Sequence, residues 1–317
     1  MARFILRRLL QALLVLVVMS FVIYNLIGLM PGDPIDAMAA GNPDMTPEAV
    51  AHLRQIYGLD QPLLLRYGHW LSGAAQGDFG FSRVHARPVL QVLMPALLRT
   101  CELMLLGFVV AVALGFGLGI LAALRPGGLV DGLIGLFAFA GISVPVFWLA
   151  LMLILLFAVE LHWLPAGGVA DLGDGGFADR ARHLVMPVAT LALAGTGIFI
   201  RYVRAAMIET MRMDHVRTAR AKGAREGRVV LAHALRLALL PPVTVMALHF
   251  GALFGGALVV ETMYARPGMG KMIYDAILGN DYNLALCGLL FATLVTLLSN
   301  LMADLAYGWL DPRITTQ

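Results

Sequence analysis

The residues with the most suggestive spacing for chemistry are two glycines beside a lysine, at positions 268–271 (Gly-Met-Gly-Lys). Such a run resembles the end of a phosphate-binding loop, in which backbone N–H groups and a lysine hold a nucleotide. The complete loop needs glycine at 265 and serine or threonine at 272, where this sequence has Ala265 and Met272. The pattern therefore predicts no nucleotide site.

Three alternating glycines, Gly115, Gly117 and Gly119, suggest dinucleotide binding at first sight. However, the dinucleotide motif follows a strand and opens a helix, and this stretch lies inside a long apolar run. Small residues in such a run let two helices approach closely. We interpret the three glycines as a packing surface.

No catalytic group stands out among the nucleophiles and titratable residues. The eight histidines are scattered, and neither a zinc-protease motif nor a serine-hydrolase motif occurs. Ser143 and Ser299 have no evident base partner, which leaves an intramembrane hydrolase without support. Cys101 and Cys287 form no metal motif and no disulfide framework. We therefore expect no catalytic residue, no metal ligand and no cofactor bound by this chain.

The strongest functional signal is a basic segment at 201–236, with nine lysines and arginines against three acidic residues. A solvated tail of this charge usually lacks apolar periodicity, yet Val216, Ala219 and Ala221 alternate with basic residues. Asp214 is a candidate N-cap and Gly223 a candidate helix end, so we expect a short helix between them. A second helix would begin at Arg225 and end before a break at residues 240–242 (Leu-Pro-Pro).

Two interpretations of this short helix stay open. A rigid helix held between two membrane spans is a lever that another protein can push. Alternatively, it lies on the membrane face, where anionic lipid contributes about 1 kcal/mol per basic residue.

The composition requires a membrane around these elements. Hydrophobic residues make up 60% and charged residues 14% of the chain, with a mean hydropathy of +0.81. A bilayer core needs roughly 20 apolar residues per helix. Six runs fit, and we expect Pro145 to kink the third, which is long enough to tilt: 9–29, 103–124, 133–159, 184–200, 237–260 and 284–303.

The lysines and arginines predict the orientation of these spans. With the N-terminus inside, the inner segments hold fourteen of them and the short outer loops only four. Cytoplasmic loops keep such an excess, so both termini are expected in the cytoplasm. The net charge of +3 then needs no nucleic acid to explain it. Arg3, Arg7 and Arg8 precede the first run, which is too long for a signal peptide, and we interpret it as a retained helix.

Ionisable residues in spans are costly and therefore informative. Five acidic residues lie near predicted span ends, where interhelical bonds or snorkelling suffice: Glu102, Asp131, Glu160, Glu261 and Asp304. Only His249 lies near a midplane. We favour a structural hydrogen bond for it over a role in lining a pore.

The roughly 70 residues between the first two spans are expected to form a small cap outside the membrane. Thr46 and Pro47 would start one helix that Gly58 ends. A second helix would run from Pro62 through Trp70 and close with a turn at residues 77–80 (Gly-Asp-Phe-Gly). We expect this cap to pack over helix ends, and docking of a solute-binding protein is the alternative.

Residues 217–223 (Arg-Thr-Ala-Arg-Ala-Lys-Gly), followed by Leu240 and Pro241, resemble the ATPase-coupling loop of permeases in bacterial ABC importers. The general loop reads Glu-Ala-Ala, three residues and Gly, then Ile-x-Leu-Pro. Here Arg217 stands in place of the glutamate and Thr218 in place of the first alanine, as in the dipeptide, oligopeptide, glutathione and nickel branch. Further stretches agree with the first type of permease subunit in that branch: 29–34, 57–62, 77–80, 259–262, 266–270 and 311–313.

The resemblance implies an all-α membrane protein with the type I ABC importer permease fold. The N-terminal transmembrane helix would be 1–30, the extracytoplasmic loop 31–93, the transmembrane core 94–307 with its coupling loop at about 205–235, and the cytoplasmic tail 308–317. It also implies that the residues contacting the ATPase are Asp214, Arg217, Thr218, Ala219, Arg220, Ala221, Lys222 and Gly223.

The implied function is half of a translocation pathway for peptides or a related small solute, in the bacterial cytoplasmic (inner) membrane. Partners would be a homologous second permease, two ATPase subunits that use ATP and Mg²⁺, an extracytoplasmic solute-binding protein and membrane lipid. The alternative, a self-sufficient secondary transporter, would carry mid-membrane ionisable residues and a repeated half-chain, and neither is evident. The identity of the solute and the pore-lining residues stay open.

Overall fold

A computed structural model describes residues 2–29, 46–56, 61–171, 173 and 175–310. The chain divides into two compact units, which are described separately. The first takes its described residues from 1–5, 100–267 and 296–317, and the second from 6–99 and 268–295.

Four helices in the described residues are long and apolar enough to cross a membrane. They are α1 (Ala2–Gly28), α5 (Val89–Leu124), α8 (Phe177–Met211) and α14 (Tyr282–Leu310). A bent pair raises the number to five if it counts as one span. The expected count of six is therefore not confirmed, although α12 (Leu240–Met263) covers most of the fifth predicted run.

The bent pair is where the structure differs most from the expected spans. The run 133–159 is not one tilted helix: α6 (Leu129–Ser143) and α7 (Val146–Leu153), which continues into the π-helix η1 (Ile154–Glu160), meet at 107°. Pro145 forces the residue before it out of the helical region, and Val144 is extended, with ψ at 125°. The proline therefore breaks the run instead of kinking it.

Prolines also mark the start of α12, as the sequence predicts. The short α10 (Glu226–Arg228), the π-helix η2 (Val229–Ala234) and α11 (Leu235–Ala238) precede it, and Leu239 is its N-cap. Pro241 and Pro242 follow in the first turn, where a missing N–H costs no helical hydrogen bond.

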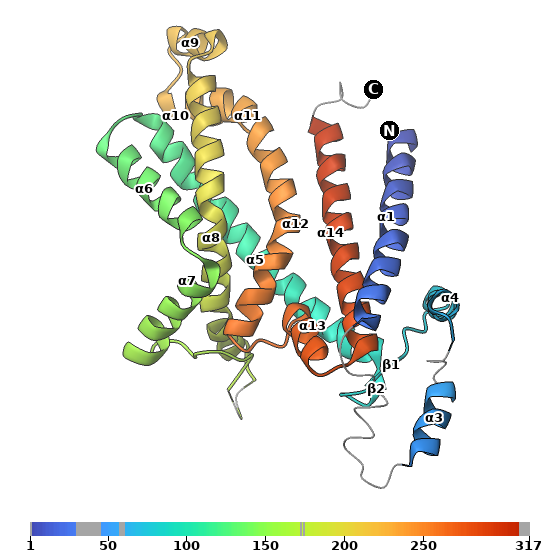
Figure 1. Ribbon diagram of the computed structural model, residues 1–317. Helices are drawn as coiled ribbons and strands as arrows, with labels where there is room; N and C mark the ends of the chain where they lie inside the picture. Colours follow the sequence, from blue (N-terminus) through green and yellow to red (C-terminus); the bar gives the residue numbers. More distant parts are fainter. Residues whose placement is uncertain (1, 30–45, 57–60, 172, 174, 311–317) are drawn as a thin grey trace. The chain divides into compact units, whose positions relative to one another are not determined.

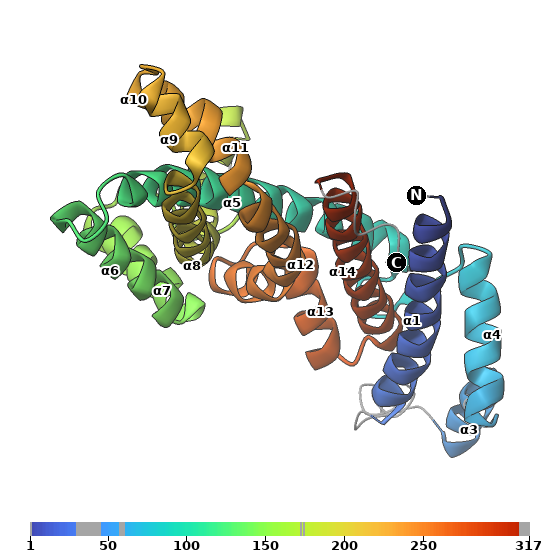
Figure 2. The same cartoon turned by 90° about the horizontal axis from the view of Figure 1, so that it is seen from above.

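In the first unit, α8 is the central helix and packs against α5, α6, α7 and α12. Figures 1 and 2 show α8 between α6 and α12. Gly115 and Gly119 of α5 lie against Phe199 and Val203 of α8, so close that a Cβ on either glycine would overlap the partner side chain. A Cβ on Gly117 would meet nothing within 4 Å. The packing interpretation of the three glycines is correct for two of them.

The second unit contains the cap after the first span. α3 (Pro47–Ile56) begins as predicted, because the Ala49 N–H donates to Thr46 Oγ1 at 3.3 Å. α4 (Leu63–Ala75) extends beyond the predicted end at Trp70, and its aromatic side chains pack on α1. The ring centroids of Tyr67 and Phe21 lie 5.2 Å apart, and the Tyr67 and Ser20 hydroxyls 2.8 Å apart. These contacts pack α4 along the side of α1, and packing of the cap over helix ends stays a prediction.

The cap ends in a small antiparallel hairpin, β1 (Phe81–Ser82) and β2 (Arg87–Pro88), which follows a turn at Gly77 and Gly80 with positive φ angles. The buried Asp281 lies between α13 (Met269–Leu278) and α14 and holds the hairpin. Ser82 Oγ and the Val84 N–H both donate to Asp281 Oδ2, at 2.5 and 3.0 Å.

Some of the residues on which predictions were made lie outside the described residues: Gly58, the stretch 311–313 and most of the stretches 29–34 and 57–62.

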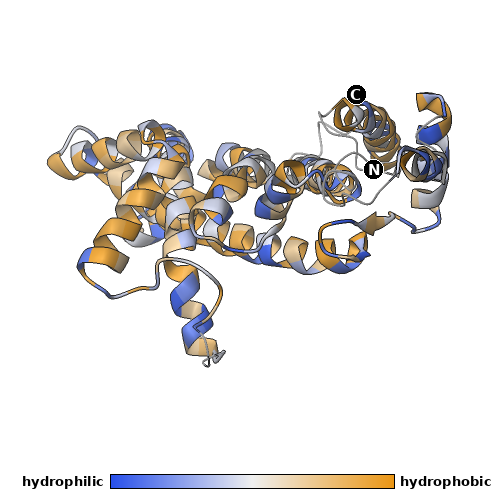
Figure 3. Cartoon of the chain, turned by 60° about the horizontal axis from the view of Figure 1, so that its bottom comes forward, coloured by the Kyte–Doolittle hydropathy of each residue, from blue (hydrophilic) through white to orange (hydrophobic). Residues whose placement is uncertain are grey.

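Hydrophobic residues predominate along the long helices of each unit (Figure 3), and many of their side chains are exposed. Examples are Leu13 and Leu14 on α1, and Leu133, Phe139 and Trp148 on α6 and α7, each between 47% and 67% exposed. Monomeric soluble proteins rarely expose so much contiguous apolar surface. Lipid is the solvent that such faces require.

The contact of α5 with α8 gives a test with opposite outcomes for neighbouring glycines. We expect Gly115→Ala to destabilise the chain by about 1–3 kcal/mol, because the new methyl group overlaps Phe199. Gly117→Ala should leave stability unchanged or raise it by about 0.5–1 kcal/mol, because alanine loses less backbone entropy in a helix. Thermal unfolding in detergent measures both. Equal losses in the two variants would contradict the assigned packing.

Candidate functional site

The basic segment forms the expected short helix, α9 (Asp214–Ala221), directly after α8. It lies beyond the end of α8 and close to α10 (Figures 1 and 2). Its start differs from the prediction, because Met213 occupies the N-cap and Asp214 is the first helical residue. The Asp214 carboxylate still favours this end, where the helix dipole attracts negative charge.

The helix ends at Gly223, as the sequence predicts, through a defined pair of hydrogen bonds. The Gly223 N–H donates to Arg220 O at 2.9 Å, and the Ala224 N–H donates to Ala219 O at 3.2 Å. This is the Schellman arrangement, which needs a residue with positive φ after the C-cap. Gly223 supplies it with a φ of 78°. The turn fixes the direction in which the chain leaves the helix.

One face of α9 is anchored in a hydrophobic core. Val216 is fully buried and Ala219 is 8% exposed. They belong to a cluster with Val203 and Met207 of α8 and with Val229 of η2. Ala123, near the end of α5, completes the connection to a second long helix. One hydrophobic core therefore joins the short helix to α5 and α8.

The other face of α9 carries polar and basic side chains into solvent. The Arg217 side chain is 74% exposed, and its Nη1 lies 3.6 Å from Asp214 Oδ1. Thr218 and Lys222 are also exposed. Ala221, expected on the apolar face, is exposed as well, because it does not share the side of Val216 and Ala219. Of the eight residues implied in ATPase coupling, only Ala219 is buried.

Arg220 does not point freely into solvent but braces the turn. Its Nη2 and Nε donate to the two carboxylate oxygens of Glu226, at 2.6 and 3.2 Å. This hydrogen bond holds the pKa of the Glu226 carboxyl below its ordinary value and raises the pKa of Arg220. The pair closes the chain across Gly223. The sequence offered one hint, an acidic residue in an otherwise basic stretch.

A second pair of oppositely charged side chains joins α6 to α8. Arg204 Nε and Nη2 donate to the two carboxylate oxygens of Asp131, at 2.5 and 2.7 Å. Asp131 Oδ2 also accepts the Gly127 N–H at 2.8 Å. Asp131 is 7% exposed, so this interhelical bond fits the role expected of acidic residues at span ends. Arg204 was predicted only as one charge of the basic segment.

Two more of the acidic residues near predicted span ends, Glu102 and Glu261, also bond to other segments. Glu160 is exposed, and the side chain of Asp304 lies outside the part that the structure describes. Arg266, which is 1% exposed, donates from Nη2 to Glu102 Oε2 at 2.6 Å. Thr100 Oγ1 donates to the buried Glu261. The hydrogen bond expected of His249 stays a prediction, because the contact described for its ring is an edge-on one with Phe199 at 5.2 Å.

Comparison with known proteins matches both parts of the chain to one kind of system. Residues 115–316 match the family model described as the inner membrane component of binding-protein-dependent transport systems. Residues 1–101 match the model described as the N-terminal part of such membrane components. The first match alone covers more than half of the chain.

Similar proteins agree with these matches. A probable peptide ABC transporter permease protein of Sinorhizobium fredii is 38% identical over 99% of both chains. A glutathione transport system permease protein of Escherichia coli is 37% identical over 99% of both chains. A crystal structure of an amino acid ABC transporter with histidines shares the fold at a TM-score of 0.54 and 12% identity, covering 68% of this chain and 93% of that one.

The apolar helices and the matches define the chain as a multi-pass permease of the ABC importer class. It belongs to the family of inner membrane components of binding-protein-dependent transport systems. The family and the all-α membrane fold are as the sequence resemblance implied. The domain boundaries drawn from it stay predictions.

The brace between Arg220 and Glu226 gives a pH test. Because the pKa of Glu226 in the folded chain lies below its ordinary value of 4.5, the stabilisation from this bond is complete above pH 4.5. It is lost as the pH falls through the lowered pKa. We expect hydrogen exchange in residues 220–226, corrected for intrinsic rate, to accelerate on acidification from about pH 5 to about pH 3. The Glu226→Gln variant should exchange at the faster rate throughout, and a pH step of the same size in that variant would contradict the assignment.

Proposed function

We propose that this chain is one permease half of an ABC importer and that α9 is the contact through which a separate ATPase drives it. The observation that carries the proposal is the two-sided character of α9. Val216 and Ala219 bury one side among long transmembrane helices, and Arg217, Thr218 and Lys222 expose the other. A partner that binds the exposed side acts directly on α5 and α8.

Stiffness is what such a contact requires. Moving a two-state gate from 1:99 to 99:1 takes roughly 5.5 kcal/mol of differential binding between its two forms. A mobile peptide would spend that free energy on its own ordering. The buried face, the Schellman turn and the bond between Arg220 and Glu226 each remove such mobility from α9.

The proposed orientation places α9 and both termini in the cytoplasm. The excess of lysine and arginine in the segments on that side supports it. The proposed partners are a homologous second permease, two ATPase subunits that bind ATP and Mg²⁺, and a solute-binding protein on the opposite side. Membership of a binding-protein-dependent transport family supports this set.

The proposed cargo is a peptide or a related small solute such as glutathione. Support comes from the names of relatives at 35–38% identity, which include peptide, oligopeptide and glutathione permeases. A self-sufficient secondary transporter is less favoured. Two of the acidic residues that could couple ions, Asp131 and Glu102, are ion-paired with arginines. Neither of these two carboxylates is free to carry a coupling ion.

Charge reversal on the exposed face of α9 tests the coupling contact. We expect Arg217→Glu to weaken assembly with the ATPase subunits at least about tenfold, which corresponds to about 1.4 kcal/mol. Solute-stimulated ATP hydrolysis should fall in parallel. Binding of the permease to immobilised ATPase, measured in lipid nanodiscs, gives the affinity.

The matched control is Arg228→Glu, an exposed arginine of α10 that changes the net charge equally. It should assemble and hydrolyse ATP as the unchanged chain does. Equal effects of the two variants would mean that the basic residues serve only lipid attraction, and intact coupling in Arg217→Glu would remove α9 from the contact.

A binding panel tests the cargo. We expect the solute-binding protein encoded with this permease to bind short peptides or glutathione, and these ligands to stimulate ATP hydrolysis by the assembled transporter several-fold. Matched free amino acids serve as the control. Uptake by the isolated chain in liposomes, driven by an ion gradient, would overturn the importer assignment.

A further inference from the structure

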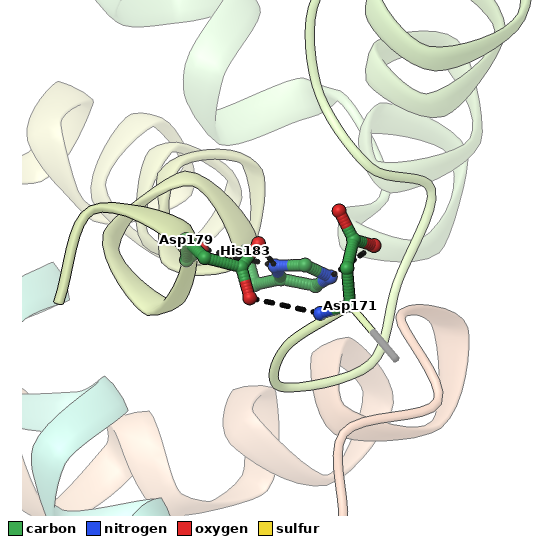
Figure 4. Close-up of side chains that lie close together, drawn as sticks. All are labelled: Asp171, Asp179 and His183. Atoms are coloured by element: carbon green, nitrogen blue, oxygen red, sulfur yellow. Dashed lines mark hydrogen bonds and ion pairs between the residues drawn. The ribbon is translucent and has the colours of Figure 1, made fainter. Parts of the chain in front are cut away.

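A second cluster of titratable side chains lies at the opposite end of α8 from α9. Asp179 and His183 belong to the first turns of α8, and Asp171 lies in the loop before it (Figure 4). One donor atom of each residue lies within 4.8 Å of the other two. Asp179 and His183 are 5% and 3% exposed, whereas Asp171 faces solvent.

Hydrogen bonding assigns the tautomer of the His183 ring. Nδ1 lies 3.0 Å from the carbonyl oxygen of Asp179, which can only accept, so Nδ1 carries the hydrogen. In the neutral ring Nε2 then holds a lone pair. That lone pair faces Asp171 Oδ1 at 3.6 Å. Two acceptors at this distance repel unless a positive charge lies between them.

Arginine and lysine do not supply that charge in the part of the chain that the structure describes. No arginine or lysine there forms an ion pair with Asp171 or Asp179, and the nearby Arg182 donates instead to Trp163 O at 3.1 Å. Asp179 Oδ2 accepts the Asp171 N–H at 2.8 Å, and Asp179 Oδ1 lies 3.3 Å from Nδ1 of His183. With a neutral His183 ring, neither contact supplies a positive charge. A buried carboxylate without a charged partner is costly.

We propose that Asp171, Asp179 and His183 bind one divalent first-row transition-metal ion. One imidazole nitrogen with two carboxylates is the donor set of zinc and its neighbours, whereas Mg²⁺ prefers oxygen donors alone. Two metal bonds of about 2.1 Å would span the 3.6 Å between Nε2 and Asp171 Oδ1 at an angle of about 120°. That angle fits tetrahedral coordination after a small adjustment.

The neighbouring contacts define what the ion would hold. The loop that carries Asp171 is already attached to the end of α12, where the Gly168 N–H donates to Tyr264 O at 2.8 Å. Tyr264 in turn shares a hydrogen bond with Thr190 of α8 at 2.9 Å. An ion on Asp171 and His183 therefore fastens the loop to α8 as well as to α12. It restrains the ends of two central helices on the side away from α9.

Direct metal titration tests the site without reference to transport. The full chain, purified without a histidine tag in lipid nanodiscs and stripped with EDTA, is titrated with ZnCl₂ at pH 7.5. We expect one zinc ion per chain, undisturbed by a large excess of MgCl₂. Both Asp171→Asn and His183→Gln should weaken zinc binding at least tenfold, and because Asp171 is exposed, its variant retains the fold.

The matched control is His162→Gln, which removes an exposed imidazole from the segment before the same loop. It should bind zinc as the unchanged chain does. Zinc binding that is absent, or equal in the unchanged chain and Asp171→Asn, would overturn the proposal and assign the bridging charge to a proton on His183. Equal loss in His162→Gln would mean that surface histidines bind the ion.

Discussion

The close contact between α5 and α8 is the constraint on which the rest of the first unit depends. Lipid provides no hydrophobic drive for two apolar helices to associate, so their backbones must approach until dispersion contacts suffice. Gly115 and Gly119 permit that approach to Phe199 and Val203. The same α8 carries α9 at one end and Asp179 with His183 at the other. Both sites therefore take their rigidity from the packing of one helix.

Charged groups add direction to this packing. A charged arginine in or beside a membrane span costs free energy unless it pairs with an acidic side chain. Arg204 donates two hydrogen bonds to Asp131, which fix α6 against α8. Arg266 donates one to Glu102 within the same unit. Such pairs contribute little net stability compared with apolar packing. Their geometry selects one arrangement of the helices.

Local rules predicted the parts of the site that depend on neighbouring residues. Gly223 ends α9 because the turn needs a positive φ, and Pro241 opens α12 because its missing N–H is harmless there. Contacts between residues distant in the sequence could not be predicted from the same local rules. The bond from Arg220 to Glu226 depends on how the chain returns after Gly223. The cluster of Asp171 with His183 depends on how a loop folds back on α8. The sequence predicted a kink at Pro145, but the two helices meet there at 107° because Val144, the residue before the proline, is also extended.

The ATPase contact proposed at α9 would need stiff elements joined to yielding ones, and the backbone supplies both. α8 is continuous over 35 residues despite Pro187 within it. By contrast, π-helical turns occur at η1, before the loop that carries Asp171, and at η2, directly after the return from α9. A π-turn lodges an extra residue in the helix and is often found at functional sites. Displacement of α9 would thus be carried by α8 and taken up at η2, whose Val229 packs on the same core. The stiff helix and the π-helical turn lie side by side. The proposed push on α9 would therefore displace the side of the core at η2 more than the side at α8.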